Sequence, residues 1–197
     1  AATVRAQVAY SLTDVSLMTA KAIVVAKVRN CFSLLGAYRQ ARVRVASDQV
    51  HMIDYARRRL VYYREQATQA QNRQSLFLIE ARATHAYWQM FAILCHAPGT
   101  WRRRYPQAYD GLNILLNTGY TTLSRHGLAA LEHAGLLPEI GVLHGDNAED
   151  GLVFDLIEPF RQSIVDNVLI PLFSRRRSGW QAVDDQTLKK GFARLHN

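Results

Sequence analysis

The sequence predicts an all-α protein, and three observations lead to that prediction. Apolar residues recur at spacings of three and four along nearly the whole chain, which is the period of a helix with one buried face. No segment alternates apolar and polar residues with the period of two that a half-buried strand requires. Hydrophobic residues make up 49% of the 197 residues, so the chain can bury a core of packed helices.

The first three predicted helices each follow from one apolar stripe. These stripes run from Val15 to Leu35, from Ala46 to Tyr63 and from Leu76 to Leu94. They predict helices at about 12–35, 43–65 and 75–96. Pro98 and Gly99 then break the pattern, so residues 97–109 are expected to form an irregular link rich in aromatic and basic residues.

Two further long helices are expected in the second half of the chain, at about 110–133 and 151–173. The residues between them contain several Gly and Pro, which indicates a loop. Pro159 lies inside the last apolar stripe and predicts a kink or a short lead-in helix. A short C-terminal helix is expected after Asp184. Because no linker or internal repeat interrupts the pattern, we expect residues 1–197 to form a single domain.

The choice of basic residues favours a nucleic-acid ligand. The chain carries 24 Lys and Arg against 16 Asp and Glu, and Arg far outnumbers Lys. Arg holds phosphate with a planar fork of donors. Three Arg runs, and Trp101 as a surface for base stacking, are the candidate contacts: Arg57, Arg58, Arg59, Trp101, Arg102, Arg103, Arg104, Arg175, Arg176 and Arg177. A solvated basic surface, or a genome rich in Arg codons, would produce the same composition.

The sequence lacks the features that usually identify several other classes of protein. Cys31 and Cys95 are too few for a disulfide framework, and no apolar run reaches the roughly 20 residues of a membrane helix. The first residues lack the apolar centre of a signal peptide. The sequence contains no P-loop, dinucleotide-binding or nucleophile-elbow motif. We therefore expect a cytoplasmic protein that does not enter a membrane.

Glu80 is the first candidate for a chemical role. It follows the apolar position Ile79 and lies at the flank of the buried stripe, on the same side as Thr84. A carboxylate beside an apolar surface needs a positive or hydrogen-bonding partner. The alternative is a surface glutamate paired with Arg73 or Arg82.

A second candidate site combines a histidine with carboxylates. His144 opens a loop of glycines and acids, and Asp155 and Glu158 follow on one face of the next helix, where Arg161 can neutralise Glu158. Such a set suits Mg²⁺ or Mn²⁺, which would activate a nucleophile and stabilise a phosphoryl-transfer transition state. The alternative is an acidic loop that caps a helix, with Asp150 at its N-terminus and the other carboxylates solvated.

Five segments, in their order along the chain, carry a more specific signal. They are 20–30 with Lys21, Lys27 and Asn30, 79–88 with Glu80, 109–120 with the pattern D-x-x-N-x-x-L…G-Y, 134–144 ending in His144, and 154–161 with Asp155. Together these segments resemble the helical C-terminal catalytic domain of the CRISPR-associated integrase family (the Cas-one family). The resemblance implies an all-α, compact multi-helix catalytic domain.

The resemblance also implies a site and a reaction. Glu80, His144 and Asp155 would be the catalytic residues and the ligands of Mg²⁺ or Mn²⁺, supported by Glu158 and Arg161. The reaction would be that of a metal-dependent DNA integrase and endonuclease of CRISPR adaptation. In it, the 3′-hydroxyl of a new spacer DNA attacks a phosphodiester of the CRISPR repeat, and water can replace that hydroxyl.

Partners follow from the resemblance in the same way. It implies double-stranded DNA as spacer precursor and repeat, a homodimer, and a small partner of the Cas-two family; some members are joined to a reverse transcriptase. The family's β-rich N-terminal domain is not found in residues 1–197, so we expect a piece of a longer or fused protein. Two alternatives stay open: a catalytically inert Arg-rich nucleic-acid-binding or assembly subunit, and an unrelated helical scaffold that binds RNA.

Overall fold

The computed structural model describes residues 2–40, 47–144 and 150–174, and it confirms the all-α prediction. Within these ranges the chain forms helices and connecting segments, without a strand. The elements are α1 (Ala2–Ser11), α2 (Val15–Gln40), α3 (Ser47–Gln69), α4 (Arg73–Leu94), α5 (Gly111–His133), α6 (Gly151–Ile157), the π-helix η1 (Gln162–Asp166) and α7 (Asn167–Ser174). None of the described helices could cross a membrane alone, by length and hydropathy; α1 and α2 meet that test only as a pair bent by 83°.

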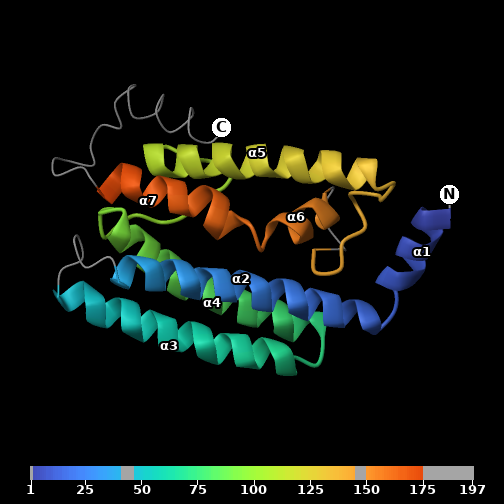
Figure 1. Cartoon of the computed structure of the whole chain (residues 1–197), viewed down its shortest axis with the longest axis horizontal. Coiled ribbons are helices and arrows are strands. Elements are labelled where there is room, and N and C mark those ends of the chain that lie inside the picture. Colours follow the sequence, from blue (N-terminus) through green and yellow to red (C-terminus); the bar gives the residue numbers. More distant parts are fainter. Residues whose placement is uncertain (1, 41–46, 145–149, 175–197) are drawn as a thin grey trace.

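The helices form two groups that pack against each other (Figure 1). α2, α3 and α4 contact one another, and α5 lies along α6, η1 and α7. The two groups meet where α2 contacts α6 and η1, and where α4 contacts α7. Buried apolar residues from both groups form one core cluster, which includes Val24, Leu60, Phe91, Leu115 and Leu169. A site built at this junction draws its residues from distant parts of the sequence.

The helix boundaries differ from the predicted ones in two informative ways. α1 lies ahead of the helix predicted at 12–35 and has no buried residue, so no apolar stripe indicates it. The helix predicted at 151–173 is interrupted: α6 ends at Ile157, a turn contains Pro159, and η1 precedes α7. The expected break at Pro159 is therefore present. The helix expected after Asp184 lies outside the described residues.

Hydrogen bonds to α5 hold the link between α4 and α5 in place. Asp110 is the N-cap of α5, and its side chain accepts from Asn113 N at 2.9 Å and from Trp101 Nε1 at 3.1 Å. The buried Asn113 side chain donates to Arg102 O and accepts from Arg104 N, both at 2.9 Å. These bonds fix the second run of arginines against the start of α5.

Candidate active site

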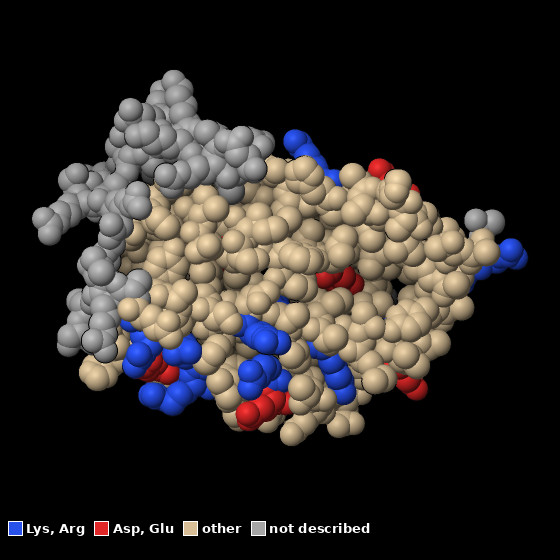
Figure 2. All heavy atoms as spheres, in the orientation of Figure 1, with Lys and Arg blue, Asp and Glu red and all other residues tan. Residues whose placement is uncertain are grey.

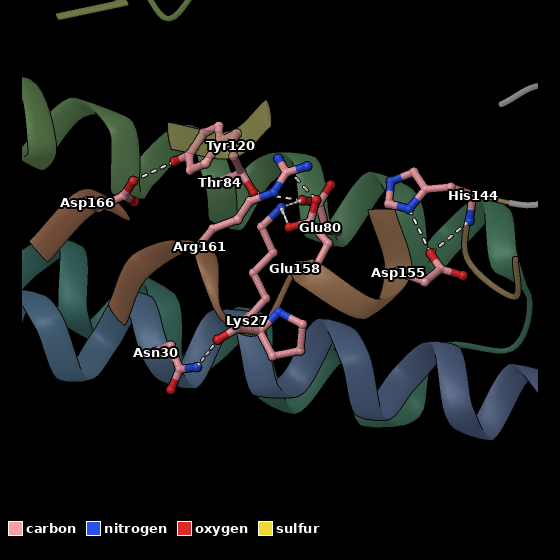
Figure 3. A network of polar contacts seen from close by, with 11 residues as sticks. Lys27, Asn30, Glu80, Thr84, Tyr120, His144, Asp155, Glu158, Arg161 and Asp166 are labelled. Carbon is pink, nitrogen blue, oxygen red and sulfur yellow. Dashed lines mark hydrogen bonds and ion pairs between the residues drawn. The ribbon is translucent and has the colours of Figure 1, made fainter. Parts of the chain in front are cut away.

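A buried lysine connects two buried glutamates where the two groups of helices meet (Figure 3). Lys27 on α2 forms ion pairs with Glu80 on α4 and with Glu158, just after α6; its Nζ lies 2.7 Å from Glu158 Oε2. The exposed fractions of Lys27, Glu80 and Glu158 are 7%, 8% and 4%. Buried charges persist when they are paired, so the three residues form one unit.

Two more side chains contact these carboxylates. Thr84, one turn after Glu80 on α4, donates its hydroxyl to Glu80 Oε1 at 2.8 Å. Arg161 Nη1 lies 3.2 Å from Glu158 Oε1. Glu158 Oε2 is buried, and its partner among the described residues is the ammonium group of Lys27. This oxygen keeps acceptor capacity for a further cation or donor.

Charge pairing, more than burial, decides the protonation of this cluster. Burial by itself lowers the pKa of Lys27, but Glu158 and Glu80 outweigh it and raise that pKa from 10.5 to about 12. Burial acts to raise the pKa of Glu158, and the charges of Lys27 and Arg161 overcome it, so this pKa lies below its usual 4.5. Lys27 is therefore protonated and Glu158 ionised at neutral pH.

His144 and Asp155 form a second pair, farther along the same strip of the molecule (Figure 3). Asp155 on α6 is 1% exposed, and its Oδ1 lies 2.8 Å from Nδ1 of His144. Its carboxylate also accepts the backbone N–H groups of Val142, Leu143 and His144, at 2.6, 2.9 and 3.2 Å. An ionised Asp155 requires a proton on Nδ1, which leaves Nε2 as the His144 atom that can bind a ligand.

The loop that carries His144 fits tightly onto the start of α6. A Cβ atom at Gly141 would lie 2.7 Å from the backbone carbon of Gly151 and 2.9 Å from Asp155 Oδ2. A Cβ atom at Gly151 would lie 2.3 Å from the carbonyl oxygen of His144. Glycine at both positions allows the close approach that brings the loop N–H groups to Asp155.

The structure places the predicted site residues in two pairs. Glu80 is paired with Lys27 and His144 with Asp155, and in the ranges that the structure describes no group of three or more His, Cys, Asp and Glu is placed to hold a metal ion. The triad of Glu80, His144 and Asp155 therefore stays a prediction. Sequence reasoning assigned no role to Lys27, although a lysine among the buried positions of an apolar helix is itself a signal.

The donors at this junction nevertheless fit a hard divalent cation in kind. Glu80 and Glu158 supply carboxylate oxygens, and His144 Nε2 is an imidazole donor in the same strip, a set that suits Mg²⁺ or Mn²⁺. The buried Glu158 Oε2, which pairs with Lys27, has a further lone pair that such a cation would use. Asp155 fits less well, because both of its oxygens already accept hydrogen bonds.

Trp101 occupies a different environment from the one that base stacking needs. Trp101 is 8% exposed. The centre of its ring lies 6.3 Å from the ring centres of both Phe91 and Trp88. Its Nε1 is bonded to the N-cap Asp110. The indole is therefore part of the core and offers little surface to a base.

The predicted arginine contacts are spread over several environments. Arg58, Arg102 and Arg104 are exposed, whereas Arg57, Arg59 and Arg103 are half-buried. The half-buried ones lie against aromatic rings; the Cζ atom of Arg57, for example, is 4.0 Å from the ring centre of Phe32. Arg175, Arg176 and Arg177 lie outside the described residues. In the face shown in Figure 2, Lys and Arg gather over the lower part, where α2 and α3 lie.

Comparisons with known proteins point to one family. The family model described as "CRISPR associated protein Cas1" matches residues 1–188. A "CRISPR-associated endonuclease Cas1 3" of Thermus thermophilus is 37% identical over 134 residues, which cover 66% of this chain and 39% of the relative. A "CRISPR-associated endonuclease Cas1 1" of Methanospirillum hungatei JF-1 is 28% identical over 81% of this chain and 46% of the relative. The matches thus span less than half the length of these relatives.

Solved structures share the fold. A "casposase bound to integration product" has a TM-score of 0.73 and 21% identity, covering 98% of this chain and 55% of the other. A Cas1 protein of Thermotoga maritima has a TM-score of 0.68 and 22% identity, covering 92% and 57%. A "partial Cas6-RT-Cas1--Cas2 complex" gives a TM-score of 0.77 and 22% identity, covering 97% and 60%. At these identities the likeness establishes the fold alone.

Proposed function

The chain belongs to the Cas1 family, and from this membership and the site geometry we propose that it is the catalytic domain of a DNA integrase and endonuclease of CRISPR adaptation. In the proposed reaction, the 3′-hydroxyl of a spacer DNA attacks a phosphodiester of the repeat. A new P–O bond forms to the spacer, and the bond to the repeat's 3′-oxygen breaks. The observation that carries the proposal is the buried Glu80–Lys27–Glu158 cluster next to His144 and Asp155.

We propose that Mg²⁺ or Mn²⁺ acts at this site. Glu80, Glu158 and Nε2 of His144 would hold it, and the cation would supply Lewis-acid stabilisation of the phosphoryl group. Asp155, assigned as a ligand by the family resemblance, is proposed here to orient His144 through Nδ1 and to hold the loop on which it lies. A carboxylate behind a ligating imidazole is a common arrangement in metal sites.

The remaining residues of the cluster position the acids. Lys27 keeps Glu80 and Glu158 together by neutralising their repulsion, and Thr84 fixes the rotamer of Glu80 through its hydroxyl. The Asn30 side chain donates to the carbonyl oxygen of Pro159, which anchors the turn next to Glu158 on α2. Phosphoryl transfer depends mainly on such positioning and on electrostatics.

The partners are proposals of the same kind. We propose double-stranded DNA as substrate, a second copy of the chain, and a Cas2 protein in the assembly, with a reverse transcriptase in fused or associated forms. Two structural relatives support this, because one is a casposase bound to integration product and another is a Cas6-RT-Cas1--Cas2 complex. The basic composition suits a polyanionic partner.

A second candidate function has one observation in its favour. Lys27 pairs with both glutamates and supplies the positive charge that a divalent cation would otherwise supply. A chain in which the lysine alone satisfies these acids would be a catalytically inert nucleic-acid-binding or assembly subunit.

A strand-transfer assay separates the two candidates. The purified chain is mixed with Mn²⁺ or Mg²⁺, a duplex oligonucleotide with free 3′-hydroxyls and supercoiled plasmid, and the joined products are measured. We expect joining that depends on the divalent cation and is lost in Glu80→Gln, while Glu132→Gln, the same change at an exposed position on α5, joins as the wild type does. Tight DNA binding without joining would favour the inert subunit.

A further inference from the structure

A pocket opens next to the carboxylate cluster, on the side of α5. It has a volume of about 470 Å³ and is walled by α4, the link before α5, α5 itself and the α6–η1 region. Three arginines line it, Arg103, Arg125 and Arg161, against a single acid, Asp150. A concave surface with this excess of positive charge favours an anion.

Two of these arginines stack against the same aromatic ring. The Cζ atoms of Arg103 and Arg161 lie 5.4 and 4.8 Å from the ring centre of Tyr120, and Arg103 also lies 5.7 Å from that of Trp88. Stacking of this kind fixes a guanidinium group without using its N–H donors. Nη1 of Arg103 donates to Arg104 O and Asn113 Oδ1, and Nη1 of Arg161 pairs with Glu158, so the other nitrogens of each group are the ones that can contact a ligand. The pocket therefore presents two oriented guanidinium groups from distant parts of the chain.

The convergence of these two charges is compensated only in part, by the ion pair of Arg161 with Glu158. Burial lowers the pKa of Arg103, and the nearby positive charge of Arg161 acts in the same direction. Arg161 Nε is buried and has no hydrogen-bond partner. Asp166, behind Tyr120, accepts the Tyr120 hydroxyl at 2.5 Å and does not pair directly with either arginine. An anion in the pocket would relieve the repulsion and satisfy the open donors.

Arg161 also borders the candidate active site. Its Nη1 lies 3.2 Å from Glu158 Oε1, and Figure 3 shows it between Tyr120 and the carboxylate cluster. A group bound in the pocket is therefore a near neighbour of the candidate active site.

We propose that this pocket binds a backbone phosphate of the substrate nucleic acid, with Arg103 and Arg161 donating to its oxygens and Tyr120 and Trp88 fixing the two guanidinium groups. The inference rests on the proposed function for the polymer, while the chemistry that it names, a phosphate, is shared with free inorganic phosphate. Contacts of this kind position a strand without reading its sequence.

The first test locates the phosphate. Binding of a labelled duplex is measured with a series in which one phosphate at a time is replaced by an uncharged methylphosphonate. We expect one position at which the wild type loses roughly tenfold in affinity. Arg103→Gln binds more weakly overall and loses nothing further at that position, whereas Arg104→Gln, the same change at the exposed neighbour, still loses it. Equal losses in the wild type and Arg103→Gln at every position would overturn the inference.

A second measurement separates the pocket from the polymer. The unfolding temperature is compared in inorganic phosphate and in chloride at equal ionic strength; we expect phosphate to stabilise the wild type and not Arg103→Gln. DNA binding without any Arg103-dependent position refutes the pocket and leaves the proposed function. Phosphate stabilisation without DNA binding refutes the proposed function and leaves a free-phosphate site. If neither occurs, the pocket is refuted as well.

A conservative variant separates loss of the phosphate contact from loss of structure around Arg103. Arg103 also donates to Asn113 Oδ1 at 3.1 Å, so its removal perturbs the link before α5. Arg103→Lys keeps the charge without the fork, and we expect it to restore part of the affinity at the located phosphate. If Arg103→Gln matches the wild type in unfolding temperature in chloride, the loss belongs to the phosphate contact.

Discussion

Lys27 connects acids from two elements that are far apart in the sequence, and its burial makes the position sensitive to charge. Replacing it with methionine would leave Glu80 and Glu158 close together, buried and without their shared cation. We expect Lys27→Met to lose about 3–5 kcal/mol in the free energy of unfolding, the usual cost of breaking a buried ion pair from one side. Denaturant unfolding measures this loss.

The control and the metal response make this prediction specific. Lys21→Met, on the same helix, removes a lysine whose Nζ donates to Thr68 O at 3.3 Å, and we expect a far smaller loss. If the two glutamates hold a divalent cation, Mn²⁺ should stabilise Lys27→Met more than it stabilises the wild type. An equal response of the two proteins would contradict the cation site.

Asp166 gives a second prediction at the same scale, in its dependence on pH. Burial raises its pKa from 3.8 to about 6, against the opposing hydrogen bonds from the hydroxyls of Tyr120 and Tyr87. Because the folded pKa is the higher one, the folded state binds the proton more tightly, and stability falls as pH rises from about 4 to about 6. Above that range both states are ionised and the loss is constant.

The asparagine variant isolates this effect. Asp166→Asn cannot ionise and can still accept from one tyrosine hydroxyl, so we expect its stability to lack this fall. The measurement is the difference in unfolding free energy between the two proteins at several pH values, since other carboxyl groups cancel in it. A difference that does not change between pH 4 and pH 6 would contradict the raised pKa.

At the scale of the elements, the sequence predicts what periodicity encodes. The long helices α2 to α5 each carry an apolar stripe, and the predicted ranges lie within a few residues of the observed ones. α1 carries no such stripe and is missed. The stripe of the last segment continues through Pro159, so periodicity alone suggests one helix, while the proline and the contact from Asn30 produce a turn. Glu158 owes its position to that turn.

The candidate site shows the same limit more sharply. The family resemblance marks Glu80, His144 and Asp155, and the structure gives each of them a buried or paired environment. The sharing of Lys27 by Glu80 and Glu158 depends on how α2, α4 and the turn after α6 pack. Neither an apolar stripe nor a sequence motif predicts that Lys27 lies within ion-pair distance of both glutamates. The pairing of Arg103 with Arg161 on Tyr120 is a property of the fold for the same reason.

At the scale of the whole molecule, charge rather than one contact should govern affinity for DNA. The chain has a formal net charge of +8 and exposes arginines on more than one element. Each phosphate that a cationic side chain neutralises releases counterions, so the logarithm of the binding constant should fall linearly with the logarithm of salt concentration, by about 0.9 per contact on duplex DNA. We expect several such contacts and a correspondingly steep slope.

Two variants test whether the salt dependence of DNA binding comes from exposed arginines or from the candidate active site. Arg58→Gln removes an exposed charge on α3 and should weaken binding for all sequences alike while lowering the slope by about one, if Arg58 contacts a phosphate. Glu80→Gln changes a buried acid, and it should abolish joining while leaving the slope almost unchanged, because the buried position makes no phosphate contact of its own. Binding measured by anisotropy over a range of salt concentrations gives both slopes. A flat dependence in the wild type would contradict DNA binding through the arginines, since no contact that releases counterions would then exist.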